Sequence, residues 1–390
     1  MSCSKVRSII DYGAREDNTN NTTYIQAAID ACTPGDTVFF PRGSYTLATV
    51  WLKSNITLEF DDGVTLLGSE NYKDYCKSET WDWNSAMFRA NDCENITVKG
   101  RALLDGRNCF CPLGEEGFRG PHMFVIYRSK NLNFEGLTVK DCANYAFLFV
   151  MCSNVSLRNI KMIAGHDGIH SQRGSDFEID GCIFRTGDDS IAGSDNVNFT
   201  VKNCRINSAC NGFRFGCNGM DMSDCVFQGP GEYMHRLEGR LSSLYAFDHF
   251  APIDRKSHIP TDNWTIKNIK ADRMLSLFRL DRNENWQEAC PAYSIIFEDA
   301  EITNMQEPIR VFCRGSRDTS LTFRRCKIAT DPTLPPMPVF EMEDFKCLTL
   351  ENTVLDNGGK APQLVLKNGK LVTNGSYQTE SSDLETEEIK

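Results

Sequence analysis

Short segments in which apolar and polar residues alternate recur along the chain, and most of them open on a polar residue. Alternation with a period of two is typical of β-strands, because successive side chains of a strand point to opposite faces. The sequence therefore predicts a chain built largely of short strands. Clear examples of the segment are Asn95-Ile-Thr-Val, Asn131-Leu-Asn-Phe, Asn154-Val-Ser-Leu, Asp176-Phe-Glu-Ile and Asn263-Trp-Thr-Ile.

The spacing of these segments is nearly constant. From Leu132 through Val155, Phe177 and Val197 to Met220, the steps are 23, 22, 20 and 23 residues. A repeat near 22 residues predicts one coil of a parallel β-solenoid for each step. Leucine-rich repeats have a similar period, but their Leu-x-x-Leu-x-Leu frame and helical return are missing from this sequence. The expected fold class is all-β.

Both ends of the chain and one internal segment depart from the repeat. The stretch 22–31 has apolar residues at helical spacing and is followed by Pro34-Gly35, which predicts a short helix that caps the first coil. Residues 230–262 interrupt the repeat, because Met220 to Trp264 spans 44 residues, one coil plus about 20 extra by the solenoid period. From 375 onward the chain is acidic with few apolar residues, so we expect a disordered tail after a single domain over 1–374.

Composition narrows the class of protein. The apolar fraction of 41% predicts a folded core, and the net charge of −11 argues against binding to nucleic acid or to anionic membranes. The longest apolar stretch, 145–152, is far too short to span a membrane. No apolar segment of a secretory signal is visible at the N-terminus, so we expect a cytoplasmic protein unless a signal has been removed.

The 17 cysteines mostly lie inside the alternating segments, which favours reduced, buried thiols over disulfides. Cys109 and Cys111 are too close together for a usual zinc site, and no metal or cofactor is expected. The Asn-x-Ser/Thr sequences at Asn95 and Asn154 match glycosylation sites. They are more simply explained as turn residues that form hydrogen bonds between coils.

Two segments carry candidate chemistry: Gly165-His166-Asp167-Gly168-Ile-His170 and Gly187-Asp188-Asp189. Asp167 and Asp188 are 21 residues apart, and Asp189 and Asn211 are 22 apart, so these side chains are expected to stack on adjacent coils about 4.8 Å apart. Clustered carboxylates raise the pKa of at least one member, and glycoside hydrolysis needs one acid and one base. Taken singly, each aspartate segment is better explained as a turn than as a site, whereas three aspartates in register favour a functional site. A stack of three also fits a Ca²⁺ site.

Several further motifs accompany the two aspartate segments: Asp11-Tyr-Gly-Ala, Ile25-Gln-Ala-Ala-Ile-Asp-Ala, Pro41-Arg-Gly-Ser-Tyr, Leu52-Lys-Ser-Asn-Ile-Thr-Leu, Thr65-Leu-Leu-Gly-Ser and Leu104-Asp-Gly. Their order resembles that of the polygalacturonase-like glycoside hydrolases of family 28, over roughly residues 8–290. The resemblance implies a right-handed parallel β-helix and hydrolysis with inversion. It implies Asp188 as the general acid, with Asp167 and Asp189 holding and activating water. Stacking on adjacent coils does not by itself establish inversion, since inverting enzymes usually keep their carboxylates farther apart.

The chain departs from the family at residues that would contact a uronate. Asn211 stands where the family has the histidine of Gly-His-Gly, and Arg279-Leu-Asp281 stands where it has Arg-Ile-Lys. Losing a cation and gaining an anion weakens binding of a substrate carboxylate. We therefore expect a different sugar or a different pattern of subsites.

Other residues are expected to contact the substrate. Arg214 alternates with two phenylalanines, so it points outward if they point inward. His235 and Arg240 belong to the insert, and long inserts in solenoids often collect on the binding face, although a solvated surface loop explains the insert equally well. The expected substrate-binding set is His166, His170, Asn211, Arg214, His235, Arg240 and Arg279.

The sequence thus predicts a glycoside hydrolase that acts on a pectin-like or other oligosaccharide or polysaccharide. Exo action is favoured because the large insert can close one end of a cleft. A Ca²⁺-dependent lyase or epimerase of uronates and a non-catalytic carbohydrate-binding β-helix are the alternatives. The sequence leaves the oligomeric state open.

Overall fold

The computed structural model describes residues 4–76, 85–282, 287, 289–359 and 361–389. Within these residues the backbone forms short parallel strands, one α-helix and three 3₁₀ turns. The chain divides into two compact units, whereas the repeat predicts one domain. Unit 1 consists of residues 1–188 and 233–239, and unit 2 of residues 189–232 and 240–390.

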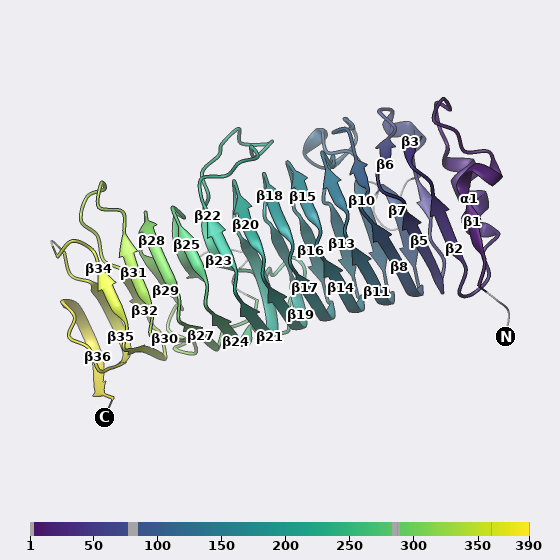
Figure 1. Cartoon of the computed structure of the whole chain (residues 1–390). Helices are drawn as coiled ribbons and strands as arrows, with labels where there is room; N and C mark the ends of the chain where they lie inside the picture. Colours follow the sequence, from purple (N-terminus) through teal and green to yellow (C-terminus); the bar gives the residue numbers. More distant parts are fainter. Residues whose placement is uncertain (1–3, 77–84, 283–286, 288, 360, 390) are drawn as a thin grey trace. The chain divides into compact units, whose positions relative to one another are not determined.

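Unit 1 is a stretch of parallel β-helix in which most coils contribute three strands (Figure 1). Two strands of each coil belong to one sheet: β1 (Val6–Ser8), β2 (Thr37–Phe40), β4 (Val50–Trp51), β5 (Ile56–Phe60), β7 (Ala86–Asn91), β8 (Glu94–Gly100), β10 (His122–Tyr127), β11 (Lys130–Glu135), β13 (Phe147–Val150), β14 (Ser153–Arg158), β16 (Ile169–Gln172) and β17 (Ser175–Asp180). The third strand belongs to a second sheet: β3 (Gly43–Leu47), β6 (Val64–Gly68), β9 (Leu103–Asp105), β12 (Thr138–Lys140), β15 (Lys161–Ala164) and β18 (Ile183–Thr186).

The register of unit 1 confirms the predicted repeat. Leu132 of β11 pairs with Val155 of β14, which pairs with Phe177 of β17. Apolar side chains consequently stack in columns inside the coils. Phe124 lies between Phe88 and Phe147, with ring centroids 4.8 and 4.9 Å apart. These columns form the core of unit 1.

Unit 2 repeats the same architecture. Its first sheet holds β19 (Ile191–Lys202), β21 (Phe213–Ser223), β23 (Tyr245–His249), β24 (Asp262–Lys267), β26 (Ser276–Asp281), β27 (Ser294–Glu298), β29 (Ile309–Phe312), β30 (Ser320–Arg324), β32 (Phe340–Glu343), β33 (Cys347–Glu351), β35 (Leu364–Thr373) and β36 (Thr379–Glu388). Its second sheet holds β20 (Arg205–Ser208), β22 (Val226–Gln228), β25 (Lys270–Asp272), β28 (Glu301–Met305), β31 (Lys327–Thr330) and β34 (Val354–Asp356). The predicted match of Val197 to Met220 is wrong by two residues, because Phe199 pairs with Met220.

The insert is two loops around a regular strand. Tyr245–His249 forms β23, which pairs in parallel with β21 on one side and β26 on the other. The 230–262 segment therefore supplies a strand of the next coil, and its additional length lies before and after that strand. Within the first loop, residues 233–239 belong to unit 1.

The two ends of the chain differ in how well the sequence predicts them. The predicted N-terminal helix is confirmed as α1 (Thr22–Asp30), which buries Ile25, Ala28 and Ile29. The tail, predicted to be disordered, instead forms β36, which pairs in parallel with β35. The exposed acidic side chains of β36 bury little apolar surface, so backbone pairing with β35 accounts for its order where composition indicates disorder.

Asparagines at the turns of unit 1 form a ladder. Asn95 donates to Asn55, Asn131 donates to Asn95, and Asn154 donates to Asn131, over 2.7–2.8 Å. All four have a positive φ, a conformation that asparagine adopts more readily than most residues. The side-chain amides therefore form hydrogen bonds with one another from coil to coil. The sequence predicts such hydrogen bonds between coils for these turn residues.

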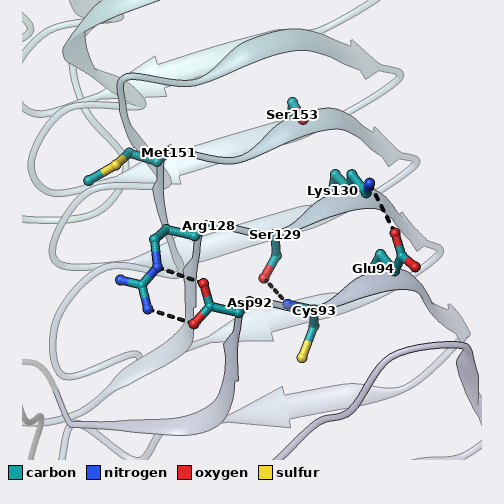
Figure 2. Close-up of a pocket in the computed structure, with 8 residues that line it drawn as sticks. All are labelled: Asp92, Cys93, Glu94, Arg128, Ser129, Lys130, Met151 and Ser153. Carbon is teal, nitrogen blue, oxygen red and sulfur yellow. Dashed lines mark hydrogen bonds and ion pairs between the residues drawn. The ribbon is translucent and has the colours of Figure 1, made fainter.

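A shallow surface groove of about 380 Å³ follows neighbouring turns of unit 1 (Figure 2). Its charged side chains are paired with one another, Arg128 with Asp92 and Lys130 with Glu94. Ser129 accepts a hydrogen bond from the backbone N–H of Cys93. These contacts connect successive coils, so the groove is explained by the packing of the turns.

The sixteen cysteines in the described residues are free thiols, and most of them are buried, as the alternation predicts. None of the described helices has the length and apolar character needed to cross a membrane.

Candidate active site

The turn before β16 and the turn after β18 bring two of the predicted aspartates together in unit 1. A carboxylate oxygen of Asp167 lies within 4.8 Å of one of Asp188. Asp167 is 2% exposed, whereas the side chain of Asp188 is 17% exposed. We call these two residues, with Arg119, His170 and His235, the Asp188 cluster. Within it, Asp188 is the carboxylate more open to a ligand.

Arg119 forms a hydrogen bond with Asp188 and lies in an irregular segment outside the sequence repeat. Its Nη2 donates to Oδ2 of Asp188 over 3.2 Å, and its Nε and Nη2 donate to the Glu116 carboxylate over 2.8 and 2.9 Å. Burial lowers the pKa of this guanidinium, but the hydrogen bonds with Glu116 and the nearby carboxylates outweigh that effect and leave it above its usual value. Arg119 is therefore a permanent cation beside Asp188.

His235 approaches the same carboxylate from the insert. Its Nε2 lies 3.7 Å from Oδ1 of Asp188, and its Nδ1 accepts a hydrogen bond from the backbone N–H of Glu238 over 3.1 Å. An accepting Nδ1 assigns the proton of the neutral ring to Nε2. The imidazole thus presents an N–H toward Asp188, which supports the prediction that the insert contributes to the site.

Two glycines let the insert loop pack directly on the backbone that carries the aspartates. A Cβ added at Gly165 would lie 2.5 Å from Cδ of Arg236, and one added at Gly187 would lie 2.5 Å from the carbonyl oxygen of Met234. The loop is fixed further by Tyr233, which donates to Asp141 over 2.7 Å. The segment 233–239 therefore packs closely against the Asp188 cluster and forms one wall of it.

The two histidines that flank Asp167 in sequence have different surroundings. His170 hydrogen-bonds Asp167 through Nδ1 at 2.9 Å, and its ring stacks on Tyr145 with centroids 4.9 Å apart. His166 is 1% exposed, and its Nε2 has no hydrogen-bond partner among the described residues. Burial and then the charge of Arg119 hold the pKa of His166 well below its usual value, so this ring stays neutral.

Asp189 follows Asp188 directly in the chain and belongs to unit 2. Its side chain is fully buried and accepts hydrogen bonds from the amide of Asn211 over 2.8 Å and from Nε of Arg214 over 2.7 Å. Asn211 itself accepts from the backbone N–H of Tyr245. We call Asp189, Asn211 and Arg214 the Asp189 cluster. Within it, Asn211 positions a carboxylate, and these donors favour the ionised form of Asp189.

Arg214 has the orientation that the alternation predicts. Phe213 and Phe215 are fully buried, while the Arg214 side chain on the opposite face of the strand is 30% exposed. Its guanidinium lies 4.5 Å from the ring centroid of Phe250. Arg240 donates to the carbonyl oxygens of Ala209 and Ser242, and its binding of substrate stays a prediction.

Arg279 is paired with an aspartate that the sequence did not identify. Its Nε and Nη2 donate to the two carboxylate oxygens of Asp248, both over 2.9 Å, and Gln287 donates to the same carboxylate over 3.0 Å. Burial raises the pKa of Asp248 to about 6, although Arg279 opposes that shift. Since β23 lies between β21 and β26, Arg279 lies two coils beyond Arg214 with Asp248 between them.

Sequence reasoning missed Arg119, Tyr233 and Asp248 for different reasons. Arg119 lies in an irregular stretch, and its partner Asp188 is 69 residues away. The contact of Tyr233 with Asp141 spans 92 residues. For Asp248 a signal existed, because Tyr245-Ala-Phe-Asp-His alternates like the other strands.

The fold and these groups define a parallel β-helix protein with carboxylates arranged at the turns between coils. A family model described as glycosyl hydrolases family 28 matches residues 33–226. The match covers 194 of the 390 residues, just under half of the chain, and shows that the chain is similar to that family. It is 49% identical over 117 residues to an exo-poly-alpha-D-galacturonosidase of Dickeya chrysanthemi, a match that covers 26% of this chain and 19% of the relative. The chain thus spans about a fifth of that relative's length.

Solved structures confirm the fold. The exopolygalacturonase of Thermotoga maritima matches with a TM-score of 0.72 at 17% identity, over 90% of this chain and 91% of that one. The family 28 exopolygalacturonase of Yersinia enterocolitica matches with a TM-score of 0.67 at 16% identity, over 99% and 78%. At these identities the likeness extends to the parallel β-helix and no further.

Proposed function

We propose that the protein is a glycoside hydrolase that cleaves galacturonate-containing, pectin-type oligosaccharides. The match to the family 28 model and the likeness to an exo-acting galacturonosidase support this activity. The observation that carries the proposal is the pairing of a partly exposed Asp188 with a buried, hydrogen-bonded Asp167. Glycosidases need two carboxyl groups with different tasks, and these two have different environments.

Asp188 acts as the general acid in this proposal. It is the more exposed carboxyl group of its cluster, so the glycosidic oxygen of a bound substrate can reach it. Asp188 gives its proton to that oxygen as the bond from the oxygen to the anomeric carbon breaks. Arg119 donates a hydrogen bond to one of its oxygens and fixes its direction, and Nε2 of His235 lies 3.7 Å from the other oxygen.

Asp167 holds and deprotonates the attacking water in unit 1. It is buried and hydrogen-bonded to Nδ1 of His170 over 2.9 Å, which fixes the direction of its carboxylate. The water forms the new bond to the anomeric carbon and passes a proton to Asp167. The family resemblance, rather than the spacing of the carboxylates, supports attack opposite the departing oxygen, which inverts the anomeric configuration. The predicted role of Asp189 in holding that water stays a prediction, since Asp189 belongs to unit 2.

Exo action follows from the loop 233–239. The loop packs on Gly165 and Gly187 and carries His235 to Asp188, so it covers the cluster on the side from which the loop enters. If the end of a substrate chain rests against this loop, only the sugar units nearest that end can reach Asp188. The chain is then shortened from that end. We expect a single small product early in the reaction rather than a ladder of fragments.

The test compares the wild type with Asp188→Asn on defined oligogalacturonides, followed by NMR with and without a chelator. We expect chelator-insensitive hydrolysis, an inverted first anomer and a loss of about 10²–10⁴-fold in the variant. Asp299→Asn, which breaks an exposed ion pair with Arg325, is the matched control and keeps full activity. Unsaturated products that require metal, or equal turnover by wild type and Asp188→Asn, would refute the proposal.

A further inference from the structure

A row of charged side chains lies in register along the first sheet of unit 2. Arg214 of β21 pairs in register with Asp248 of β23, Asp248 with Arg279 of β26, Arg279 with Arg310 of β29, and Arg310 with Glu341 of β32. In a parallel β-helix, residues in register stack on the same face of successive coils. These five side chains therefore form one continuous strip, which begins beside Asp189.

Every arginine of this strip already has a carboxylate partner. Arg214 donates to Asp189 over 2.7 Å, and Arg279 binds Asp248 through both carboxylate oxygens over 2.9 Å. Arg310 donates to Glu341 over 3.0 Å and to Glu307 over 2.7 Å. The positive charges of the arginines are balanced by these carboxylates, so the strip offers little net attraction to a polyanion.

The Asp248–Arg279 pair is the most enclosed of these contacts. The Asp248 side chain is 2% exposed and that of Arg279 is 18% exposed. Gln287 donates to Asp248 as well, and the Arg279 guanidinium lies 4.3 Å from the ring centroid of Tyr245. A substrate carboxylate that bound Arg279 would displace a bidentate, largely desolvated partner, which is costly.

We propose that Asp248 is a specificity-determining residue, whose carboxylate occupies Arg279 so that the sugar unit bound at this coil carries no charge. This inference rests on the proposed function and names its substrate more closely. The substrate is an oligosaccharide in which galacturonate is followed by a neutral or esterified sugar. Asp281 supports the assignment, because residues two apart in a strand share a face and Asp281 adds a further acidic side chain beside Arg279.

The experiment measures kcat/KM for two substrates of equal length. One is an oligogalacturonide, and the other alternates galacturonate with a neutral sugar. We expect the wild type to prefer the alternating substrate. In Asp248→Asn, which leaves Arg279 without its carboxylate partner, we expect the ratio to shift toward the oligogalacturonide by about tenfold or more, as an Arg–carboxylate hydrogen bond implies.

Two further variants separate specificity from stability. Asp299→Asn breaks another bidentate Asp–Arg pair of unit 2 and is expected to leave the ratio unchanged. The double variant Asp248→Asn/Arg279→Gln removes both charges and is expected to lose the gain on the oligogalacturonide. A purely structural role of Asp248 would lower both rates and leave their ratio unchanged.

The ratio of kcat/KM for the two substrates, measured on the wild type, tests the inference even if Asp248→Asn does not fold. A wild type that prefers the oligogalacturonide overturns the inference and leaves the proposed hydrolase intact. An unchanged ratio in a folded Asp248→Asn also overturns it. Failure of the wild type to hydrolyse either substrate, with its β-structure intact by circular dichroism, would instead overturn the proposed function together with the inference.

Discussion

Arg119 donates from Nη2 to the carboxylate of Asp188 over 3.2 Å, although 69 residues separate the two in the chain. The guanidinium is 5% exposed and shares its donors between Asp188 and Glu116. Removing one partner of a buried ion pair leaves the other partners uncompensated. The stability of this region and the position of Asp188 therefore depend on the same side chain.

For Arg119→Met we expect the free energy of unfolding to fall by about 3–5 kcal/mol, since two carboxylates lose their cation in a partly buried site. Urea unfolding measures the change. Arg128→Met is the control, because its pair with Asp92 is exposed and worth about 1 kcal/mol or less. Equal losses in the two variants would show that burial of Arg119 does not matter.

His170 offers a way to separate packing from hydrogen bonding. His170→Phe keeps a ring against Tyr145 but removes the hydrogen bond to Asp167. We expect kcat to fall by about 10–100-fold with little change in Tm, because a misplaced catalytic carboxylate slows the reaction. His170→Ala, which loses both contacts, should also lower Tm. An unchanged kcat in His170→Phe would remove His170 from the positioning of Asp167.

Gly187 is expected to accept no side chain. A Cβ there would lie 2.5 Å from the carbonyl oxygens of both Gly165 and Met234, so Gly187→Ala displaces the loop 233–239 or strains the coil. We expect a loss of about 1–3 kcal/mol in unfolding free energy and faster proteolysis within the loop. Gly239→Ala adds a Cβ with nothing within 4 Å, so it shows the cost of an alanine at a left-handed glycine (φ 64°) without a steric clash. Equal protease resistance in Gly187→Ala and wild type would contradict the packing.

His249 makes the stability of the protein pH-dependent. It is fully buried, both ring nitrogens lack hydrogen-bond partners among the described residues, and burial lowers its pKa to about 3. Between pH 6.5 and 3 the unfolded chain binds a proton that the folded chain does not. The free energy of unfolding consequently falls with falling pH, by up to about 5 kcal/mol from this group.

His249→Leu should flatten that slope and retain stability at neutral pH, because it removes two unpaired polar atoms. Urea unfolding at a series of pH values measures the effect. The exposed His258→Leu serves as the control and should keep the wild-type slope. A slope that stays steep in His249→Leu would assign the acid sensitivity to other groups.

The repeat made much of the fold predictable. Pairs such as Leu132 with Val155 follow from alternation and spacing alone, because parallel coils place residues about 22 positions apart in register. The same arithmetic brought Asp167 and Asp188 to neighbouring turns. It failed at β23, where a long loop concealed a regular strand, and at β36, where backbone pairing orders an acidic segment.

What the sequence by itself determined is therefore the coil, its core columns and the aspartates at its turns, since these depend on contacts that recur with every repeat. Only the tertiary structure decided which partners those aspartates have. Arg119 reaches Asp188 from an irregular segment, His235 reaches it from an insert, and Asp248 occupies Arg279. Such contacts depend on where loops of no fixed period fold back, and neither alternation nor spacing encodes that choice.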